Sequence, residues 1–498
     1  MINNIFNIFS WQRFVEWLEP IFTKANGEIL FTNIEFWFVF VIFFAFYLLS
    51  LHARRRWVML AYTLLFNLFF AWKISGWVML IMPATILLTW LMTQLLRQTE
   101  GAGRSWILAI DIILTLVPLV VFRYSNMLIS GINELMQSNF PLIQLIVPVG
   151  ISFYTLQAIS YAVDVYRKRF TTPVDLLEYS FYLTFFPLLL AGPITRAETL
   201  IPQIKSDQRP DDNVVYNGMW LIMLGLIKKC LFADYIAIYN NWIFEDPTGY
   251  SGFETLIAMM GYIVQIYYDF SGYSDISIGI AALLGFQLRD NFNFPFKALN
   301  ITDFWRRWHI SLSSWIRDYI YIPLGGNRNG KILMCFNLLF AMTIAGLWHG
   351  ANLTFIVWGL LNGIMLTLHK LAKPALDHIP DNWLIKPISI TLTFTFISLT
   401  MAFFGAVNID ESMLILKHGF SNFDIAYFIP FCQARPLWMV FVVGGLILHL
   451  TSSWWYEKTK RYFIEAPWIV KIIIIIAVVQ IIINFSNEDI QPFIYMKF

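Results

Sequence analysis

The sequence predicts an all-α protein that crosses a membrane many times. Hydrophobic residues make up 58% of its 498 residues and charged residues only 13%, and its mean hydropathy is +0.62. A soluble chain is about 25% charged, so these few charged side chains cannot cover a large water-soluble protein. Long apolar runs recur along the chain, and each approaches the ~20 residues that a helix needs to span a bilayer.

The first expected element is a helix within residues 1–30 that lies in the membrane interface. This segment lacks the basic start of a signal peptide, and Arg13, Glu16 and Glu19 interrupt its apolar stretch. At helical spacing the apolar residues fall on one face and the charged residues on the other, which suits a helix at headgroup depth. The alternative is a helix packed against the rest of the protein.

The apolar runs that follow predict spanning helices in a membrane domain of residues 31–484. Two further apolar regions, 142–164 and 177–194, contain prolines and glycines. A broken helix at membrane depth survives only where protein buries it or where it lines a cavity. About 12 crossings are expected, with one broken region re-entrant. The clearest runs are 34–50, 57–72, 77–96, 106–122, 214–231, 253–268, 332–347, 352–370, 386–407, 436–454 and 466–484.

Basic residues predict which side of the membrane each loop faces, because cytoplasmic loops carry an excess of Lys and Arg. Basic residues cluster after the first run at 54–56, two runs later at 97 and 104, in the segment 167–169, and before the last run at 458–461. These loops are expected to be cytoplasmic. Both termini are then extracytoplasmic.

Charge and cysteine content exclude several functions. The formal net charge is only +2, and the basic residues are scattered, so a nucleic-acid partner is not expected. Cys230, Cys335 and Cys432 lie far apart and form neither a disulfide framework nor a metal-binding knuckle. We expect all three to be packing residues, and we expect no metal.

Polar residues in apolar surroundings are the candidates for function, because each is costly against lipid. Within 148–167, Ser152, Thr155 and Gln157 either line a wet path or hydrogen-bond to neighbouring helices. Prolines and a glycine in 186–196 predict a re-entrant turn. Asp269 and Asp275 follow a predicted span, where they either relay protons or pair with arginines that fix the loops.

The densest polar block, 303–328, is typical of an amphipathic helix followed by a Gly-Gly turn. Trp305 and His309 are four residues apart and would share a helix face. Arg306 and Arg307 add two fixed charges, which suit the pyrophosphate and adenine of an anionic cofactor. The alternative is an interfacial helix whose arginines reach anionic lipid headgroups.

A second histidine, His349, lies between two strongly apolar runs in the segment Trp348-His349-Gly350-Ala-Asn352. An imidazole there is costly unless it is hydrogen-bonded or used. Burial favours the neutral form of an imidazole, whose ordinary pKa is ~6.5. A neutral imidazole accepts a proton from an attacking hydroxyl, so this position is a candidate general base. We find no nucleophile elbow, HExxH or P-loop motif in the sequence.

At these residues the chain resembles a known family. Phe304-Trp-Arg-Arg-Trp-His309-Ile-Ser, followed by Trp348-His349-Gly350, is similar to the membrane-bound O-acyltransferase (MBOAT) superfamily. Segments 148–167, 186–196 and 269–279 also resemble blocks of its bacterial alginate O-acetyltransferase branch. The chain is also similar to peptidoglycan O-acetyltransferases and to the membrane subunits of D-alanyl transfer. The blocks keep their order, and the resemblance covers residues 30–498.

The resemblance implies a helical ring around a transmembrane tunnel in the bacterial inner membrane. A cytoplasmic thioester, acetyl-CoA or an acyl carrier protein, would donate an acetyl group for O-acetylation of an extracytoplasmic polysaccharide or glycan, with no permanently bound cofactor. It assigns catalysis to His349 and His309, and it implies a periplasmic or membrane-anchored, esterase-like acetyltransferase partner. We expect substrate-binding side chains at Trp305, Arg306, Arg307, Trp308, Gln157, Trp348 and Asn352.

The tail, 485–498, ends in Phe493-Ile-Tyr495-Met-Lys-Phe498. It resembles the aromatic C-terminal motif of some bacterial family members, which implies that the Tyr495 phenol carries the acyl group to the exterior acceptor. The alternative is an aromatic residue of the interfacial belt.

Two other functions are compatible with the same residues. Other branches of the family acylate a lipid or sterol within the bilayer. A transporter or flippase of an envelope precursor would also use broken helices, but no inverted pair of broken segments is visible. The two histidines in polar blocks and the basic, aromatic helix favour an enzyme over a transporter.

Overall fold

The computed structural model describes residues 16, 19, 21–23, 30–52, 55–206, 210–380, 382–451 and 453–485. Those residues form helices and connecting segments, with no strand among them, which confirms the predicted all-α class. Tyr495 and nearly all of residues 1–30 lie outside the described residues, so the predicted interfacial helix and the tail beyond Phe485 stay predictions.

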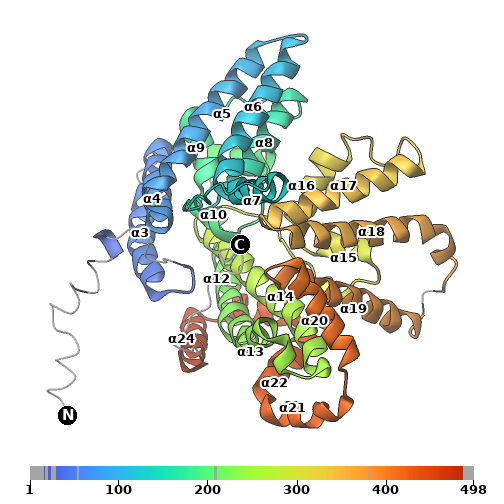
Figure 1. Ribbon diagram of the computed structural model, residues 1–498. Helices are drawn as coiled ribbons and strands as arrows, with labels where there is room; N and C mark the ends of the chain where they lie inside the picture. Colours follow the sequence, from blue (N-terminus) through green and yellow to red (C-terminus); the bar gives the residue numbers. More distant parts are fainter. Residues whose placement is uncertain are drawn as a thin grey trace. The chain divides into compact units, whose positions relative to one another are not determined.

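The chain forms two compact units (Figure 1). The first holds the described parts of Met1–Ser125, Asn139–Leu190 and Arg196–Arg209, and the second holds those of Asn126–Ser138, Ala191–Thr195 and Pro210–Phe498. The first unit contains α3 (Ile34–His52), α4 (Arg56–Ser75), η1 (Gly76–Leu80), α5 (Ile81–Gln98), α6 (Gly103–Leu119), η2 (Val120–Tyr124), α8 (Ile151–Tyr166), α9 (Leu176–Thr184), nearly all of α10 (Phe186–Ala191), and α11 (Ala197–Lys205).

The second unit is built around the long helix α14 (Gly252–Leu283). Its other helices are α7 (Ser125–Met136, whose first residue belongs to the first unit), α12 (Asp212–Leu226), η3 (Ile227–Ala233), α13 (Asp234–Glu245), η4 (Pro247–Gly249), η5 (Pro295–Lys297), α15 (Ile301–Arg307), α16 (Ile310–Ile316), η6 (Arg317–Tyr321), α17 (Lys331–His349), α18 (Leu353–Leu376), α19 (Ile385–Gly405), α20 (Ile409–Ser421), η7 (Ile425–Tyr427), α21 (Phe428–Ala434), α22 (Pro436–Leu450), α23 (Ser453–Glu465) and α24 (Trp468–Phe485).

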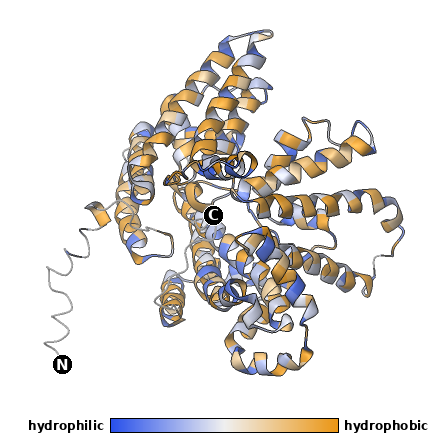
Figure 2. Cartoon of the chain, in the orientation of Figure 1, coloured by the Kyte–Doolittle hydropathy of each residue, from blue (hydrophilic) through white to orange (hydrophobic). Residues whose placement is uncertain are grey.

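Several helices are long and apolar enough to cross a membrane. The described residues contain seven such segments, or eight if the bent pair α21–α22 with its preceding turn is one span. One of the seven, Arg56–Gln98, holds two of the predicted runs. Hydrophobic residues dominate the long helices of both units, and hydrophilic ones gather toward ends and loops (Figure 2). The protein is therefore a polytopic membrane protein, and the count of about 12 crossings stays a prediction.

The two broken apolar regions are broken as their prolines and glycines predict. Gly150 adopts a φ of 72° just before α8 begins, and a Cβ there would lie 2.9 Å from the carbonyl oxygen of Leu189. In the other region α9 ends at Thr184 and α10 begins at Phe186. Buried Asn67 bridges this break, because its amide donates to Thr184 Oγ1 (3.1 Å) and accepts from the Phe186 backbone N–H (3.2 Å). Re-entrance of either region stays a prediction.

Within the first unit, two of the basic segments expected on one side of the membrane meet, and a third basic segment contacts other helices. Arg56 pairs with Glu178 and donates to the carbonyl of Ile204. The next basic loop reaches the segment after α8: Arg97 Nη1 donates to Thr171 O (2.9 Å) and Arg104 Nη2 to Tyr166 O (2.9 Å). The loop between α5 and α6 therefore meets the segment after α8, while Arg56 connects the start of α4 to α9 and α11.

Glycines bring two helix pairs of the second unit into backbone contact. A Cβ on Gly225 of α12 would lie 2.5 Å from the carbonyl oxygen of Gly272 on α14, and one on Gly279 would lie 2.6 Å from that of Gly218. Gly346 in α17 likewise faces α18, where a Cβ would overlap the Phe355 carbonyl. Small residues allow such close packing between helices in membranes. Helix α17 ends at His349, one turn after this close contact with α18.

The carboxylates predicted to relay protons or to pair with arginines pair with lysines instead. Lys228 Nζ lies 2.6 Å from Asp275, and Lys229 Nζ lies 2.7 Å from both Asp269 and Asp234. Both lysines belong to η3, a π-helical turn that packs on α14 beside Gly272. The prediction of ion pairing is confirmed and the prediction of arginine partners is wrong, because this helix contact is not visible in local sequence.

Candidate active site

His349 is the last residue of α17 and is buried. Its imidazole meets Trp358 of α18 edge to face, with ring centroids 5.1 Å apart, and lies 5.2 Å from Phe404 of α19. Its neighbour Trp348 lies 5.1 Å away. Three helices therefore converge on one imidazole and surround it with aromatic rings.

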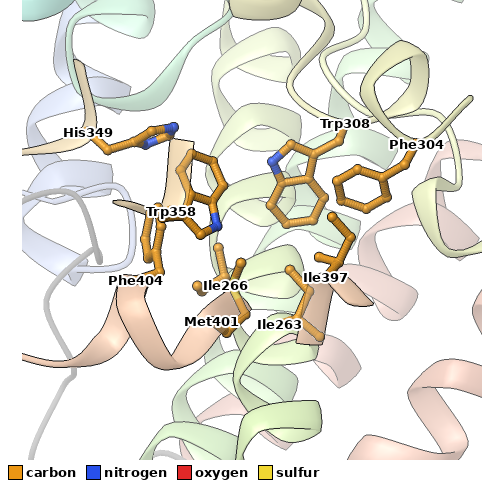
Figure 3. A pocket seen from close by; sticks show the side chains of 9 residues that line it. All are labelled: Ile263, Ile266, Phe304, Trp308, His349, Trp358, Ile397, Met401 and Phe404. Carbon is orange, nitrogen blue, oxygen red and sulfur yellow. The ribbon is translucent and has the colours of Figure 1, made fainter. Parts of the chain in front are cut away.

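His349 lines a narrow pocket within the second unit, with a cavity volume of about 10 Å³. Figure 3 shows His349, Trp358 and Phe404 toward one end and Trp308 and Phe304 toward the other. The imidazole is the single ionisable group of the lining, which otherwise consists of Ile263, Ile266, Phe304, Trp308, Trp358, Ile397, Met401 and Phe404. This lining is apolar and aromatic, so it suits an apolar group better than a charged one.

The predicted amphipathic helix over the densest polar block is broken in the structure. Helix α15 ends at Arg307, and α16 begins at Ile310. His309 lies in the break with a φ of 42°, in the left-handed region. Two backbone hydrogen bonds to the segment after α14 hold the break open, from Asn293 N to Arg307 O (2.9 Å) and from Ile310 N to Asn291 O (2.9 Å). Trp305 and His309 therefore do not share a helix face as predicted, whereas the Gly-Gly turn is present, with positive φ at residues 325 and 326.

The break turns His309 inward. Its side chain is buried and packs edge to face on Phe270 of α14 (4.7 Å), and its Nδ1 lies 3.2 Å from Asn291 Oδ1. Burial lowers the pKa of His309 to about 3, so the ring is neutral at physiological pH. Sequence reasoning missed Asn291, because a lone asparagine in a loop carries no periodic signal.

Trp348 connects the two predicted catalytic histidines. Its indole lies 5.6 Å from the His309 ring and 5.1 Å from the His349 ring, measured between centroids. The structure thus brings together the rings of His309, Trp348 and His349. Trp308 lines the pocket beside them, and Trp305 contacts Trp358 at 5.7 Å.

The two arginines predicted to bind phosphate, Arg306 and Arg307, differ in their exposure and in their hydrogen-bond partners. Arg307 Nε lies 2.9 Å from Asp303 Oδ1, one helical turn earlier, and a second nitrogen donates to the carbonyl of Asn293. Arg306, next to it, is exposed. Only Arg306 presents an exposed guanidinium, and Arg307 is committed to holding α15.

Asn352 and Gln157, which were predicted to bind substrate, are not among the residues that line the pocket. Asn352 caps α18, because its Oδ1 accepts from Thr354 N (3.0 Å), and it also donates to the carbonyl of Val407. Gln157 is buried in α8 of the first unit. In the same helix Ser152 accepts from Arg123, which supports helix-to-helix hydrogen bonding for that residue.

Comparison with known proteins places these residues in context. The family model of MBOAT, the membrane-bound O-acyltransferase family, matches residues 165–406, which include both histidines. A peptidoglycan O-acetyltransferase of Helicobacter pylori is 33% identical over 78% of this chain and 79% of its own. A probable alginate O-acetylase of Pseudomonas aeruginosa is 33% identical over 79% of this chain and 75% of its own. A teichoic acid D-alanyltransferase of Bacillus subtilis is 26% identical over 52% of this chain and 69% of its own.

Proposed function

Since this chain belongs to the membrane-bound O-acyltransferase family and is an O-acyltransferase, we propose that it moves an acetyl group from a cytoplasmic thioester to an extracytoplasmic polysaccharide or glycan. The inner membrane of a bacterium is the proposed location. The observation that carries the chemical part is the buried His349 imidazole in an apolar, aromatic pocket.

In the proposed reaction His349 acts as the general base. It accepts the proton of an acceptor hydroxyl while the hydroxyl oxygen attacks the carbonyl carbon of the thioester. The carbon–sulfur bond breaks, and the departing thiolate takes up the proton. The aromatic walls support this role, because a site that excludes water protects the acyl group from hydrolysis.

The proposed donor is acetyl-CoA or an acetylated acyl carrier protein, whose phosphates carry negative charge. Exposed Arg306 would attract those phosphates, while Arg307, already oriented by Asp303, would hold α15 and Trp308 in place. An exposed arginine costs little to pair with a phosphate, and its planar fork makes two parallel hydrogen bonds.

The proposed acceptor pathway uses the C-terminal tail. The phenol of Tyr495 would take the acetyl group first and lose its proton to a base. An esterase-like partner outside the membrane would then transfer the group to a sugar hydroxyl. Phenolate is a better leaving group than an alkoxide, so this onward step is favourable.

The experiment uses purified full-length protein in lipid vesicles with acetyl-CoA labelled in the acetyl group. Slow release of free thiol, and label that appears on the protein, are expected. A protein that releases no thiol from acetyl-CoA or from an acetylated carrier protein, but moves a labelled envelope precursor across the vesicle, would overturn the proposal in favour of transport.

A further inference from the structure

The side-chain carbonyl of Asn291 gathers three donors from the break between α15 and α16. Its Oδ1 lies 3.1 Å from the backbone N of Ser311, 2.9 Å from Ser311 Oγ and 3.2 Å from His309 Nδ1. The residue is 1% exposed, so water does not compete for these bonds. One asparagine therefore holds both the backbone of the break and the ring of the histidine in it.

The backbone donor determines which way the Asn291 amide points. An N–H of the main chain can only donate, so the atom that faces Ser311 N must be the amide oxygen. The other end of the amide agrees: Nδ2 lies 3.4 Å from Ser274 Oγ, whose hydroxyl donates to the carbonyl of Ala191 (3.2 Å). A flipped amide would set its own N–H donors against the backbone N–H of Ser311, and it would turn its oxygen toward a Ser274 hydroxyl that already donates to Ala191.

This orientation determines the tautomer of His309. An amide oxygen is an acceptor only, so His309 Nδ1 must carry the hydrogen that it donates to Asn291. In the neutral ring the lone pair then lies on Nε2. That nitrogen is buried and has no hydrogen-bond partner among the residues that the structure describes. A nitrogen in this state is ready to accept a proton or a hydrogen bond from a substrate.

We propose that Asn291 is a positioning residue for acyl transfer, which holds His309 in the Nδ1–H tautomer and leaves Nε2 as the acceptor. The contribution of Asn291 to acyl transfer rests on the proposed function. The tautomer of His309 does not, because it follows from the hydrogen bonds alone. Asn291 also joins three separated polar blocks of the sequence, since its hydrogen bonds connect His309 to Ser274 and, through it, to Ala191.

A neutral amide orients the His309 ring without changing its charge state, whereas a carboxylate would change it. A carboxylate next to Nδ1 would orient the ring equally well but would also favour the imidazolium. Asn291 orients the ring without adding charge, and the other groups packed on His309 are Phe270, Phe292 and Trp348, none of which titrates near neutral pH. The ring therefore stays neutral and keeps its lone pair.

The test compares Asn291→Ala and Asn291→Asp with a matched control, Asn67→Ala. Asn67 is also fully buried, accepts from a backbone N–H and donates to a hydroxyl, but it does so in the first unit. We expect Asn291→Ala to lower the acyl-transfer rate about 100-fold, close to the effect of His309→Ala, with no further loss in the double variant. Asn67→Ala should keep the wild-type rate in whatever fraction of the protein folds.

The variant Asn291→Asp tests whether residue 291 acts by accepting a hydrogen bond from His309 or only by filling space. It keeps an acceptor for Nδ1 but adds charge, so activity should be retained at high pH while the acid limb of the pH profile moves to higher pH by about one unit or more. An unmoved acid limb in Asn291→Asp, or additive losses in Asn291→Ala with His309→Ala, would overturn the proposal.

A measurement without turnover distinguishes failure of this proposal from failure of the proposed function. Nitrogen NMR of protein labelled in histidine, with the His309 signals identified by subtraction of His309→Ala, should show a protonated Nδ1 and a bare Nε2 at neutral pH. A bare Nδ1 overturns the proposal whatever the protein's activity. The expected tautomer in a protein that transfers no acyl group would refute the function and leave the positioning by Asn291 intact.

Discussion

The imidazole of His349 and the indole of Trp358 meet edge to face, with ring centroids 5.1 Å apart and planes at 87°. The two residues belong to α17 and α18, which the glycines Gly346 and Gly359 bring into backbone contact. This geometry encloses the histidine in apolar, aromatic surface at the end of an apolar helix.

His349→Ala is expected to abolish acyl transfer while the protein still folds and inserts into the membrane. Loss of a general base costs ~10²–10⁴-fold in rate. Thiol release and acetyl transfer, measured at equal protein levels, give the result. The control is His378→Ala, since His378 is exposed and bonds only within its own turn. Full activity in His349→Ala would refute its role as the base.

Arg306→Gln is expected to raise the KM for acetyl-CoA more than it lowers kcat, because it removes the exposed charge proposed to bind the donor in ground and transition states alike. Arg307→Gln should act through its ion pair, so Asp303→Asn should reproduce its effect. Steady-state kinetics with varied acetyl-CoA separates the two. An unchanged KM in both arginine variants would leave these side chains as lipid headgroup contacts only.

Lys229→Met is expected to lower stability strongly, because it leaves Asp234 and Asp269 without their shared cation. Removing one partner of a buried ion pair costs about 3–5 kcal/mol. Thermal unfolding in detergent measures the effect. The exposed pair between Lys373 and Asp377 provides the control, and Lys373→Met should change the midpoint little. Equal midpoints in the two variants would contradict the structural role of the buried cluster.

Acid is expected to destabilise the protein through His309. Its folded pKa is about 3, below the ordinary value of 6.5, so the unfolded chain binds the proton first as the pH falls. Stability contributed by the neutral ring is therefore full above about pH 6.5 and is lost progressively toward pH 3. The unfolding midpoint should fall less steeply between pH 6.5 and 4 in His309→Gln than in the wild type, and parallel curves would contradict burial of the neutral ring.

Tyr495→Phe is expected to eliminate acetylation of the exterior polymer without loss of protein from the membrane. The substitution keeps the ring and removes only the hydroxyl that would carry the acetyl group. Mass spectrometry of the C-terminal peptide should find one added acetyl group on Tyr495 in the wild type. Normal polymer acetylation in the variant would leave Tyr495 as a residue of the aromatic belt.

Local pattern was enough to predict the class of the protein and to single out two of its seven histidines as candidates for function. Apolar runs predict helices in a membrane because backbone hydrogen bonds must close within each segment there. Prolines and glycines marked both broken regions, since their effects on the backbone act within a few residues. His349 stood out because a polar ring in apolar sequence is costly unless it has a use, and His309 stood out because it lies in the densest polar block of the chain.

Contacts between segments far apart in the sequence determined the features that local pattern did not predict. The break at His309 depends on backbone bonds to Asn291 and Asn293, and the partners of Asp269 and Asp275 depend on the packing of η3 against α14. The pocket around His349 draws its walls from five segments of the chain, which no local pattern connects. The sequence by itself determined which groups are polar, apolar or flexible. Only the tertiary structure determined which of them meet, because the energy of a contact depends on geometry that is set by the whole packed unit.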